Sequence, residues 1–466
     1  MSLTCRRGAP TQRRYAAKIR GDSSPEAGGG SNTVTGQILS LPGVVSGATV
    51  ASVTTRDRQH GMTDRAALVV RLMAMSSVVI GLLACSRSPS APATLSWDPK
   101  GAASYLDRRI AWWMGWSNAA RDHGTFCVSC HTAVPYALAR PGLDSLLGEG
   151  TSTAVERKLR DNVRRRVRLW DETEPFYADT GDAGGKSAES RGTDAVLSAL
   201  LLAWDDARSG RLSADTRAAF GHMWAVQHTS GHDVGAWSWL ESDEAPWEID
   251  GARYYGAALA ALAVGVAPDN YRALPQIQDH LQLLRSYLAR NYSTQSLHDR
   301  VVLLWASTKF PGLLEPERCQ SVVSDVLRAQ NPDGGWSLSK LLSRSSEAGV
   351  LSNPDSDGYA TGLITLALEQ AGQGRDAVQR GLTWLVENQR GHGGFWIRGP
   401  EGFWIATSQN KHRLPWSNVG RFMADAATGF AVLALTQAPH AELKMASPTS
   451  VSIAAHRQRP SPKGIF

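Results

Sequence analysis

One short run of the sequence carries residue types that could hold a cofactor. Cys127 and Cys130 are separated by two residues, and His131 follows directly. A chain with five Cys and twelve His in 466 residues would contain about 0.001 such C-x-x-C-H runs by chance. In an exported chain this spacing is typical of c-type haem attachment, with two thioethers to the haem and the adjacent imidazole on the iron. The run therefore predicts a covalent haem c on Cys127 and Cys130, with His131 as the metal ligand.

Two simpler interpretations of the same run stay open. Cys127 and Cys130 could form a disulfide or a thiol redox pair, and the three side chains could supply ligands of a zinc site. A disulfide needs no cofactor and would leave the rest of the chain as a binding scaffold. Which of these chemistries applies depends on how the surrounding helices and loops place the three side chains.

Residues 62–85 indicate export. A short basic region precedes the apolar run 72–84, which has the length of a signal-peptide core and is too short for a spanning helix. The run ends in Leu-Leu-Ala-Cys, which resembles the bacterial lipobox. We therefore expect 62–84 to be a lipoprotein signal peptide and Cys85 to be lipidated. An ordinary cleaved signal peptide is the alternative, and it predicts export as well.

Three further segments lack the pattern of a folded core. Residues 1–61 carry no apolar periodicity and are expected to be disordered, or untranslated if Met62 is the start. Residues 85–100 are rich in Ser, Pro and Ala and predict a linker, and residues 439–466 predict a disordered tail. Acyl chains on the lipidated cysteine would hold the protein at the periplasmic face of a bacterial membrane.

Charge and cysteine usage narrow the classes of function. The net charge of +6 is modest, and the arginines gather near the N-terminus and in 157–168, so nucleic acid is not expected as a partner. An exported chain meets an oxidising compartment, where Cys127 and Cys130 must be oxidised, metallated or thioether-linked. Cys319 lies in a helical pattern and predicts a small, buried side chain.

The pattern from residue 101 to residue 438 is helical. Gly, Pro and Asp separate the apolar segments, and no alternating strand pattern interrupts them. The segments pair as helical hairpins at intervals of about 50–60 residues, a period typical of repeat architectures. The six predicted pairs are 102–118 with 127–140, 152–170 with 193–207, 213–228 with 252–266, 275–291 with 296–308, 316–330 with 357–371, and 374–389 with 422–437.

The two members of each pair differ in polarity. In the first members, as in 152–170, apolar residues recur at every fourth position and charged residues occupy the other face. The second members are apolar nearly all round, as in 195–204 and 426–435. A helix without a polar face is buried on every side. Six amphipathic helices outside six buried ones predict an all-α (α/α)6 toroid.

The loops inside the hairpins share a second pattern, in which a Gln is followed by glycines and a Trp. The clean copies are Gln330 to Trp336 and Gln389 to Trp396, and a stretched copy runs from Gln227 to Trp237. Such a Gln can hydrogen-bond backbone groups of a neighbouring turn, and the Trp can cover the junction. These copies and the apolar helices after them resemble the repeats of squalene–hopene cyclases, in the superfamily of terpenoid cyclases and protein prenyltransferases. The resemblance spans 101–438 and implies the toroid fold.

The resemblance also implies catalytic carboxylates. Class II terpenoid cyclases protonate an alkene with an Asp of a D-x-D-D motif, and the closest match here is Asp355-Ser-Asp357-Gly. By resemblance Asp357 falls on the protonating carboxylate, and Asp355 is a second candidate catalytic residue. The last Asp of the motif is Gly358 here, and the chain is too short for the second barrel of a squalene–hopene cyclase. The zinc ligands of the prenyltransferases have no recognisable counterparts.

Helix capping explains the same carboxylates without a reaction. Asp is a favoured N-cap, and acids there complement the helix dipole. Every later inner segment has acids near its expected start: Asp194, Glu248, Asp250, Asp299, Asp355, Asp357 and Asp425. A ring of N-caps is therefore an alternative to a catalytic role for Asp357.

A closed ring of hairpins would place the haem at the mouth of a central cavity. Hairpin six would then lie beside hairpin one, so Met423 is a candidate second metal ligand, with His412 and His123 as rivals. Core filling explains Met423 equally well. Aromatic residues near the same mouth predict a site for an apolar or polyprenyl ligand, or simply pack the repeats: Trp247, Tyr254, Tyr255, Trp404 and Trp416.

These features predict an exported, lipid-anchored toroid with a covalent c-type haem. Its expected role is electron transfer or haem redox chemistry, which requires a redox partner protein. One alternative is a terpenoid-cyclase-like enzyme that acts on a polyprenyl substrate through Asp357. The other is a non-catalytic binding scaffold with a Cys127–Cys130 disulfide.

Overall fold

The structure is a computed structural model, and it describes residues 97–179, 185–342, 354–390, 402–414 and 416–438. The chain separates into two units, Met1–Ser88 and Pro89–Phe466, and all described residues belong to the second. The predictions for the N-terminal segment, the signal peptide with Cys85, most of the linker and the C-terminal tail lie outside the described residues.

The described part of the chain is mostly helical, as predicted. Its α-helices are α2 (Pro99–Gly115), α3 (Ala133–Leu147), α4 (Ala154–Arg168), α5 (Lys186–Ser209), α6 (Ala214–Ala225), α7 (Arg253–Val266), α8 (Gln278–Asn291), α9 (Leu297–Lys309), α10 (Pro316–Ala329), α11 (Leu338–Leu342), α12 (Gly358–Gln370), α13 (Arg375–Glu387) and α14 (Phe422–Gln437). Short 3-10 turns are η1 (Asp122–Gly124), η2 (Tyr271–Ala273), η3 (Pro275–Ile277), η4 (Tyr292–Thr294) and η5 (Val419–Arg421).

The sequence pattern missed a small sheet and misplaced the starts of two inner helices, α3 and α5. Strands β1 (Ala120–Arg121) and β2 (Thr125–Phe126) pair antiparallel just before the C-x-x-C-H run. The predicted segment 127–140 begins as a non-helical turn, and α3 starts only at Ala133. The reason is local, because Ser129 Oγ accepts hydrogen bonds from the backbone amides of Thr132 and Ala133 at 3.3 and 3.0 Å. The run thus lies between β2 and α3.

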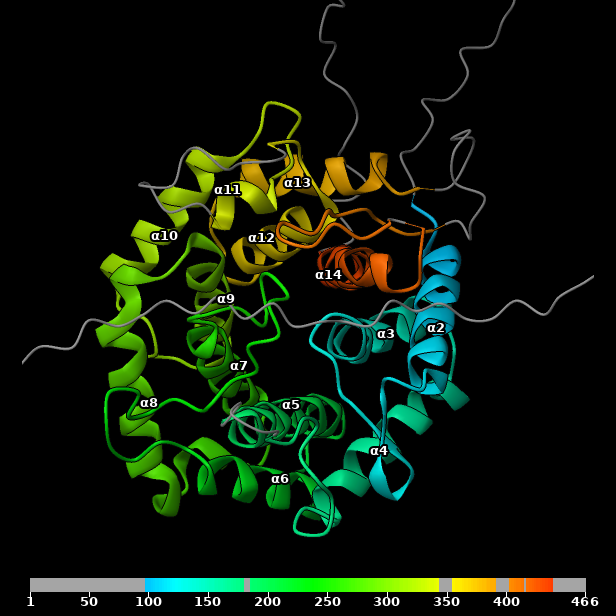
Figure 1. Ribbon diagram of the computed structural model, residues 1–466. Helices are drawn as coiled ribbons and strands as arrows, with labels where there is room; N and C mark the ends of the chain where they lie inside the picture. Colours follow the sequence, from blue (N-terminus) through cyan, green and yellow to red (C-terminus); the bar gives the residue numbers. More distant parts are fainter. Residues whose placement is uncertain (1–96, 180–184, 343–353, 391–401, 415, 439–466) are drawn as a thin grey trace, which may run out of the picture. The chain divides into compact units, whose positions relative to one another are not determined.

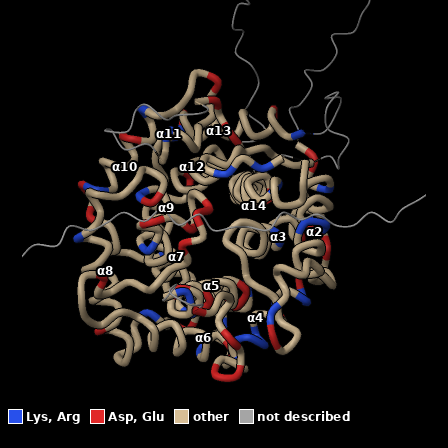
Figure 2. The backbone as a smooth tube through the Cα atoms, in the orientation of Figure 1, with Lys and Arg blue, Asp and Glu red and all other residues tan. Residues whose placement is uncertain are grey.

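The apolar helices contact one another in a cyclic order. α3 contacts α5, α5 contacts α7, α7 contacts α9, α9 contacts α12, α12 contacts α14, and α14 contacts α3. Figure 1 shows these six helices inside and α2, α4, α6, α8, α10 and α13 outside. In Figure 2 the inner helix α14 is drawn almost entirely without charged residues, whereas Lys, Arg, Asp and Glu recur on the outer helices. The difference in polarity between the two members of each pair therefore matches their burial.

Glycines let neighbouring inner helices approach closely. A Cβ at Gly362 of α12 would lie 2.6 Å from the backbone nitrogen of Ala431 in α14. A Cβ at Gly429 of α14 would lie 2.4 Å from Cβ of Pro135 in α3. Real Cβ atoms do not approach this closely, so the packing of these helices requires glycine at positions 362 and 429.

The repeated Gln residues join each hairpin to the next. Gln330 Nε2 donates to the carbonyl oxygen of Gly334 at 2.8 Å and to that of Ala377 in α13 at 3.0 Å. Gln227 makes the same pair of bonds, to Gly235 and to His280 in α8, both at 3.1 Å.

Gln389 repeats this geometry between the last hairpin and the first. Its Nε2 donates to Gly402 at 3.1 Å and to Asp98 at 2.9 Å. Asp98 caps the N-terminus of α2 and its amide donates back to Gln389 at 2.6 Å. The folded part therefore begins before residue 101, and Gln389 connects its two ends.

The Trp of the last repeat copy is Trp404, and the prediction of Trp396 was wrong. The indole nitrogens of Trp237, Trp336 and Trp404 donate to the carbonyls of Met223, Val326 and Leu385 at 2.7, 2.7 and 2.8 Å. Each of these carbonyls lies four residues before the repeat Gln, and each Trp lies two residues after the glycine that this Gln bonds. Trp396 lies outside the described residues, and a longer connection separates Gln389 from its glycine.

One helical stretch within the described ranges, Val419–Gln437, is long and apolar enough to cross a membrane. Its most apolar window is 78% buried. It includes α14, whose inner position accounts for this composition.

Candidate functional site

The backbone of the C-x-x-C-H run is held on both sides. The Cys127 amide donates to the carbonyl oxygen of Ala119 at 2.8 Å, and the Cys127 carbonyl accepts from Trp113 Nε1 at 2.7 Å. Asn162 of α4 bonds both the amide and the carbonyl of Phe126, at 2.8 and 3.0 Å. Cys127 and Cys130 are buried and both are free thiols. The run is therefore a fixed part of the core.

The imidazole of His131 is packed among aromatic rings from three parts of the chain. It stacks on Phe422 of α14 with ring centroids 3.7 Å apart, and it meets Trp113 of α2 edge-on at 5.0 Å. Trp247, just before α7, lies 6.0 Å away. The start of α14 thus lies beside the run, as the closed ring predicts. Phe422 makes this contact, and Met423 is buried in the core.

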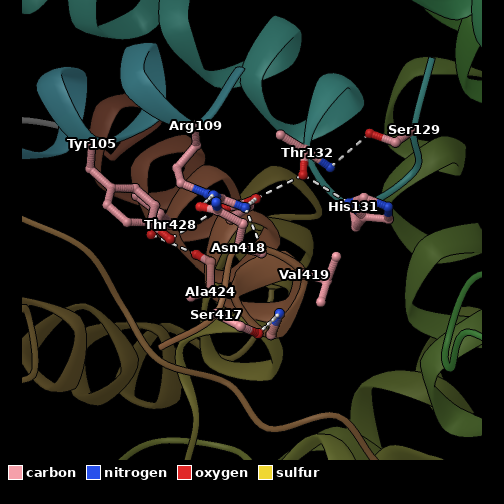
Figure 3. A network of polar contacts seen from close by, with 12 residues as sticks. Tyr105, Arg109, Ser129, His131, Thr132, Ser417, Asn418, Val419, Ala424 and Thr428 are labelled. Atoms are coloured by element: carbon pink, nitrogen blue, oxygen red, sulfur yellow. Dashed lines mark hydrogen bonds and ion pairs between the residues drawn. The ribbon is translucent and has the colours of Figure 1, made fainter. Parts of the chain in front are cut away.

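A hydrogen-bonded chain leads from His131 to Asp425 (Figure 3). Thr132 Oγ1 donates to Asp425 Oδ2 at 2.7 Å. A hydroxyl has a single hydrogen, so the 2.8 Å contact between Thr132 Oγ1 and His131 Nδ1 must use the imidazole N–H as the donor. Nε2 then carries the lone pair. Among the described residues, Thr132 is the only hydrogen-bond partner of this imidazole.

Asp425 is held in place by a buried arginine. Arg109 Nε donates to Oδ1 at 2.6 Å and Nη2 donates to Oδ2 at 2.8 Å. The Tyr105 hydroxyl donates to Oδ1 at 2.8 Å. Burial raises the pKa of Asp425, and the charge of Arg109 opposes that shift. With four donors directed at its two oxygens, the carboxylate acts as an acceptor and orders Thr132.

Burial sets the protonation state of the three side chains. It holds the pKa of His131 well below its usual range, and the positive charges of Arg413 and Arg109 act in the same direction. The imidazole is therefore neutral near pH 7, which is the form that binds metals. Burial also raises the pKa of Cys127 to about 12 and that of Cys130 well above its usual value. Thiol redox pairs have a lowered pKa, so the direction of these two shifts does not favour a thiol redox pair.

The residue types of the run match the donors of a c-type haem site. Two free thiols stand at that spacing, and the following imidazole donates its Nδ1 hydrogen to Thr132, which leaves the lone pair on Nε2. Phe422 covers one face of the ring. Within the described ranges, no three His, Cys, Asp or Glu side chains gather as a metal-binding cluster.

The other predicted metal ligands and catalytic acids lie elsewhere. His123 and His412 are exposed, and His123 is 3.7 Å from Asp122. Asp355 is exposed before α12. Asp357 caps α12, because its two carboxylate oxygens accept from the amides of Ala360 at 2.9 Å and Leu338 at 2.6 Å. Burial raises the pKa of Asp357 to about 6.

Capping does not explain the whole ring of acids. Asp194 and Asp425 lie inside α5 and α14, and both pair with buried arginines, Arg166 at 3.0 Å and Arg109 at 2.6 Å. Neither residue is an N-cap, although Asp425 does lie in the first turn of α14, which begins at Phe422 as predicted. The start of α5 was misjudged, because α5 begins at Lys186, well before its apolar run.

The relay through Arg109, Thr132 and Asp425 was missed at the level of sequence. Arg109 lies in an outer helix, where an arginine side chain is usually exposed. In the structure it is only 4% exposed. Thr132 directly follows the C-x-x-C-H run, and that adjacency was the one available signal. A second missed group surrounds Tyr359, whose hydroxyl contacts Trp247 Nε1 at 3.0 Å and His298 Nε2 at 2.8 Å.

The aromatic residues predicted near the inner-helix starts divide into two groups. One, Trp416, is 70% exposed. The other four are fully buried in the core, as packing of the repeats requires: Trp247, Tyr254, Tyr255 and Trp404.

Comparisons with known proteins assign no family. No protein-family model matches the chain, and no curated protein matches it. Among solved structures it is similar to one described as "Glycosidase E178A", with a TM-score of 0.39 and 14% sequence identity. That match covers 74% of this chain and 97% of the other.

Proposed function

We propose that this chain is an exported, lipid-anchored electron-transfer or haem redox protein, in which an (α/α)6 toroid carries a covalent c-type haem. Cys127 and Cys130 would hold the haem through thioethers, and His131 would bind its iron. The toroid is supported by the cyclic order of inner-helix contacts and by the bonds between Gln389 and Asp98. Lipidation of Cys85 would keep the protein at the periplasmic face of the membrane.

The observation that carries this proposal is the direction of the hydrogen bond between His131 and Thr132. It leaves the imidazole with its proton on Nδ1 and its lone pair on Nε2. Histidines that bind metals almost always donate their other ring N–H to such a partner, which fixes the ring and raises its basicity.

The surrounding residues have defined roles in this proposal. When bound, a haem supplies reversible one-electron chemistry at its iron. Thr132 accepts the Nδ1 proton in a hydrogen bond, and Asp425 orients Thr132. Arg109 balances the charge of Asp425 in the buried site. Trp113 and Phe422 keep water from the imidazole and lower the local dielectric constant.

The test is a visible spectrum and an intact mass of the denatured chain. The protein would be made from Met62 in a host with the machinery for cytochrome c maturation. We expect a reduced spectrum of the c type and a haem mass that stays on the unfolded chain. The double variant Cys127→Ala, Cys130→Ala should lose both signals, whereas Cys319→Ala is the matched control and should keep them.

A colourless protein of unmodified mass would overturn the haem proposal. If its mass also rose by about 2 Da on reduction, the Cys127–Cys130 disulfide of a binding scaffold would take its place.

A further inference from the structure

The inner helices leave a cavity at their carboxyl ends. It has a volume of about 500 Å³ and is lined by residues of α3, α5, α7, α9 and α14. The cavity reaches the last turns of these helices, at Val266, Lys309 and Gln437. The C-x-x-C-H run, in contrast, precedes the first turn of α3. The size lies in the range of small-molecule sites, so the cavity is a candidate binding site separate from the haem motif.

The inner wall of the cavity is apolar, and one of its residues, Trp204, contacts the buried ring of Trp305. Leu138, Trp204 and Leu433 line it. The ring of Trp305 meets that of Trp204 edge-on, with centroids 6.1 Å apart. Trp305 is 1% exposed, and its indole N–H has no hydrogen-bond partner among the described residues. A buried donor left without an acceptor costs about 1–3 kcal/mol. Trp305 itself does not line the cavity.

The charged residues that line the cavity are both cations. Lys309 follows Trp305 by one turn of α9, and Arg208 follows Trp204 by one turn of α5. Of these four residues, Trp204, Arg208 and Lys309 line the cavity. Lys309 Nζ donates to Gln370 Oε1 at 2.6 Å, which leaves two of its three hydrogens for a ligand. The lining contains neither Asp nor Glu.

We propose that this cavity binds an amphipathic anion, a long-chain carboxylate. Its alkyl chain would lie against Trp204 and Leu433, and its carboxylate would pair with Lys309 and Arg208. The cations and the apolar wall are complementary to the two ends of such a molecule. This proposal stands on the cavity alone and does not depend on the haem.

Calorimetric titration of the full protein with palmitate tests the proposal, with hexadecanol as the uncharged probe. We expect saturable binding of one palmitate per chain. The double variant Lys309→Gln, Arg208→Gln should weaken palmitate binding by about tenfold or more and leave hexadecanol binding unchanged. Lys158→Gln, an exposed lysine of α4, is the matched control.

A second variant guards against loss of the fold. Ala207 is exposed on the cavity lining, so Ala207→Trp should fill the cavity and abolish binding of both probes without a change in the thermal unfolding midpoint. Palmitate binding that survives in both variants, or an absence of saturable binding, would overturn the proposal. Lys309 and Arg208 would then act only by interacting favourably with the dipoles at the carboxyl ends of α9 and α5.

Discussion

Thr132 Oγ1 donates its single hydrogen to Asp425 Oδ2 across 2.7 Å, and this bond assigns the proton of the neighbouring His131 to Nδ1. The partners come from opposite ends of the folded part, 293 residues apart. The tautomer of the candidate haem ligand therefore depends on how the last inner helix meets the first.

If the proposed haem is bound, removal of the Thr132 hydroxyl should change the reduction potential of its iron. In Thr132→Val the imidazole N–H loses its acceptor, so the ring donates less electron density and the oxidised iron is less stabilised. We expect the reduction potential to rise by tens of millivolts, as measured by redox titration. Thr132→Ser keeps the hydroxyl and is the matched control.

The same variant has a readout that needs no haem. Thr132→Val leaves the buried N–H of His131 without an acceptor and removes one donor from Asp425. The free energy of unfolding in urea should fall by about 1–3 kcal/mol, and serine should restore it. A valine variant with unchanged potential and unchanged stability would show that the relay does not order His131.

The close approach of α14 and α3 can be tested by adding a single methyl group at Gly429 and measuring the free energy of unfolding. Gly429→Ala places a Cβ 2.4 Å from Cβ of Pro135, which the packed helices cannot accept without moving. We expect a loss of about 1–3 kcal/mol in the free energy of unfolding. Gly221→Ala in α6 is the control, because its Cβ would meet nothing within 4 Å. It should stabilise the helix by about 0.5–1 kcal/mol.

If Trp404 is the Trp of the last repeat copy, truncation of its side chain should strongly reduce the stability of the fold. Trp404 is fully buried and donates to the Leu385 carbonyl, so Trp404→Ala should cost about 3–5 kcal/mol in chemical denaturation. Trp416 is 70% exposed, and Trp416→Ala should change stability by no more than about 0.5 kcal/mol. Equal effects of the two substitutions would contradict the assignment.

The raised pKa of Asp357 predicts a pH-dependent difference between the protein and Asp357→Asn. The folded carboxyl has a pKa of about 6, above the value near 3.9 expected when unfolded. Between these values the folded state binds more protons, so stability falls as the pH rises from about 4 to 6. Asn also caps helices but does not ionise.

The variant should therefore gain stability relative to the parent across this window, by roughly 1–3 kcal/mol at pH 7, as urea unfolding at several pH values would measure. A constant difference across the window would contradict the shift. Loss of turnover of a polyprenyl substrate in the same variant would instead support the cyclase alternative.

The helical content and the place of most helices could be predicted from local sequence patterns. Apolar periodicity and the Gly, Pro and Asp residues between segments are local signals, and they do not need the rest of the chain. The C-x-x-C-H run is local in the same sense, because the spacing of Cys127, Cys130 and His131 is itself the chemical requirement. Local patterns failed where a connection was long, as between Gln389 and Trp404.

The side chains that contact and orient His131 could not be predicted before the fold was known. Arg109 and Asp425 are 316 residues apart, and Tyr105 and Asp425 are 320 apart. No local pattern can encode such a pairing, because it arises when the last inner helix packs against the first hairpin. The cavity between Lys309 and Arg208 has the same origin, since its lining comes from five inner helices that meet only in the folded state.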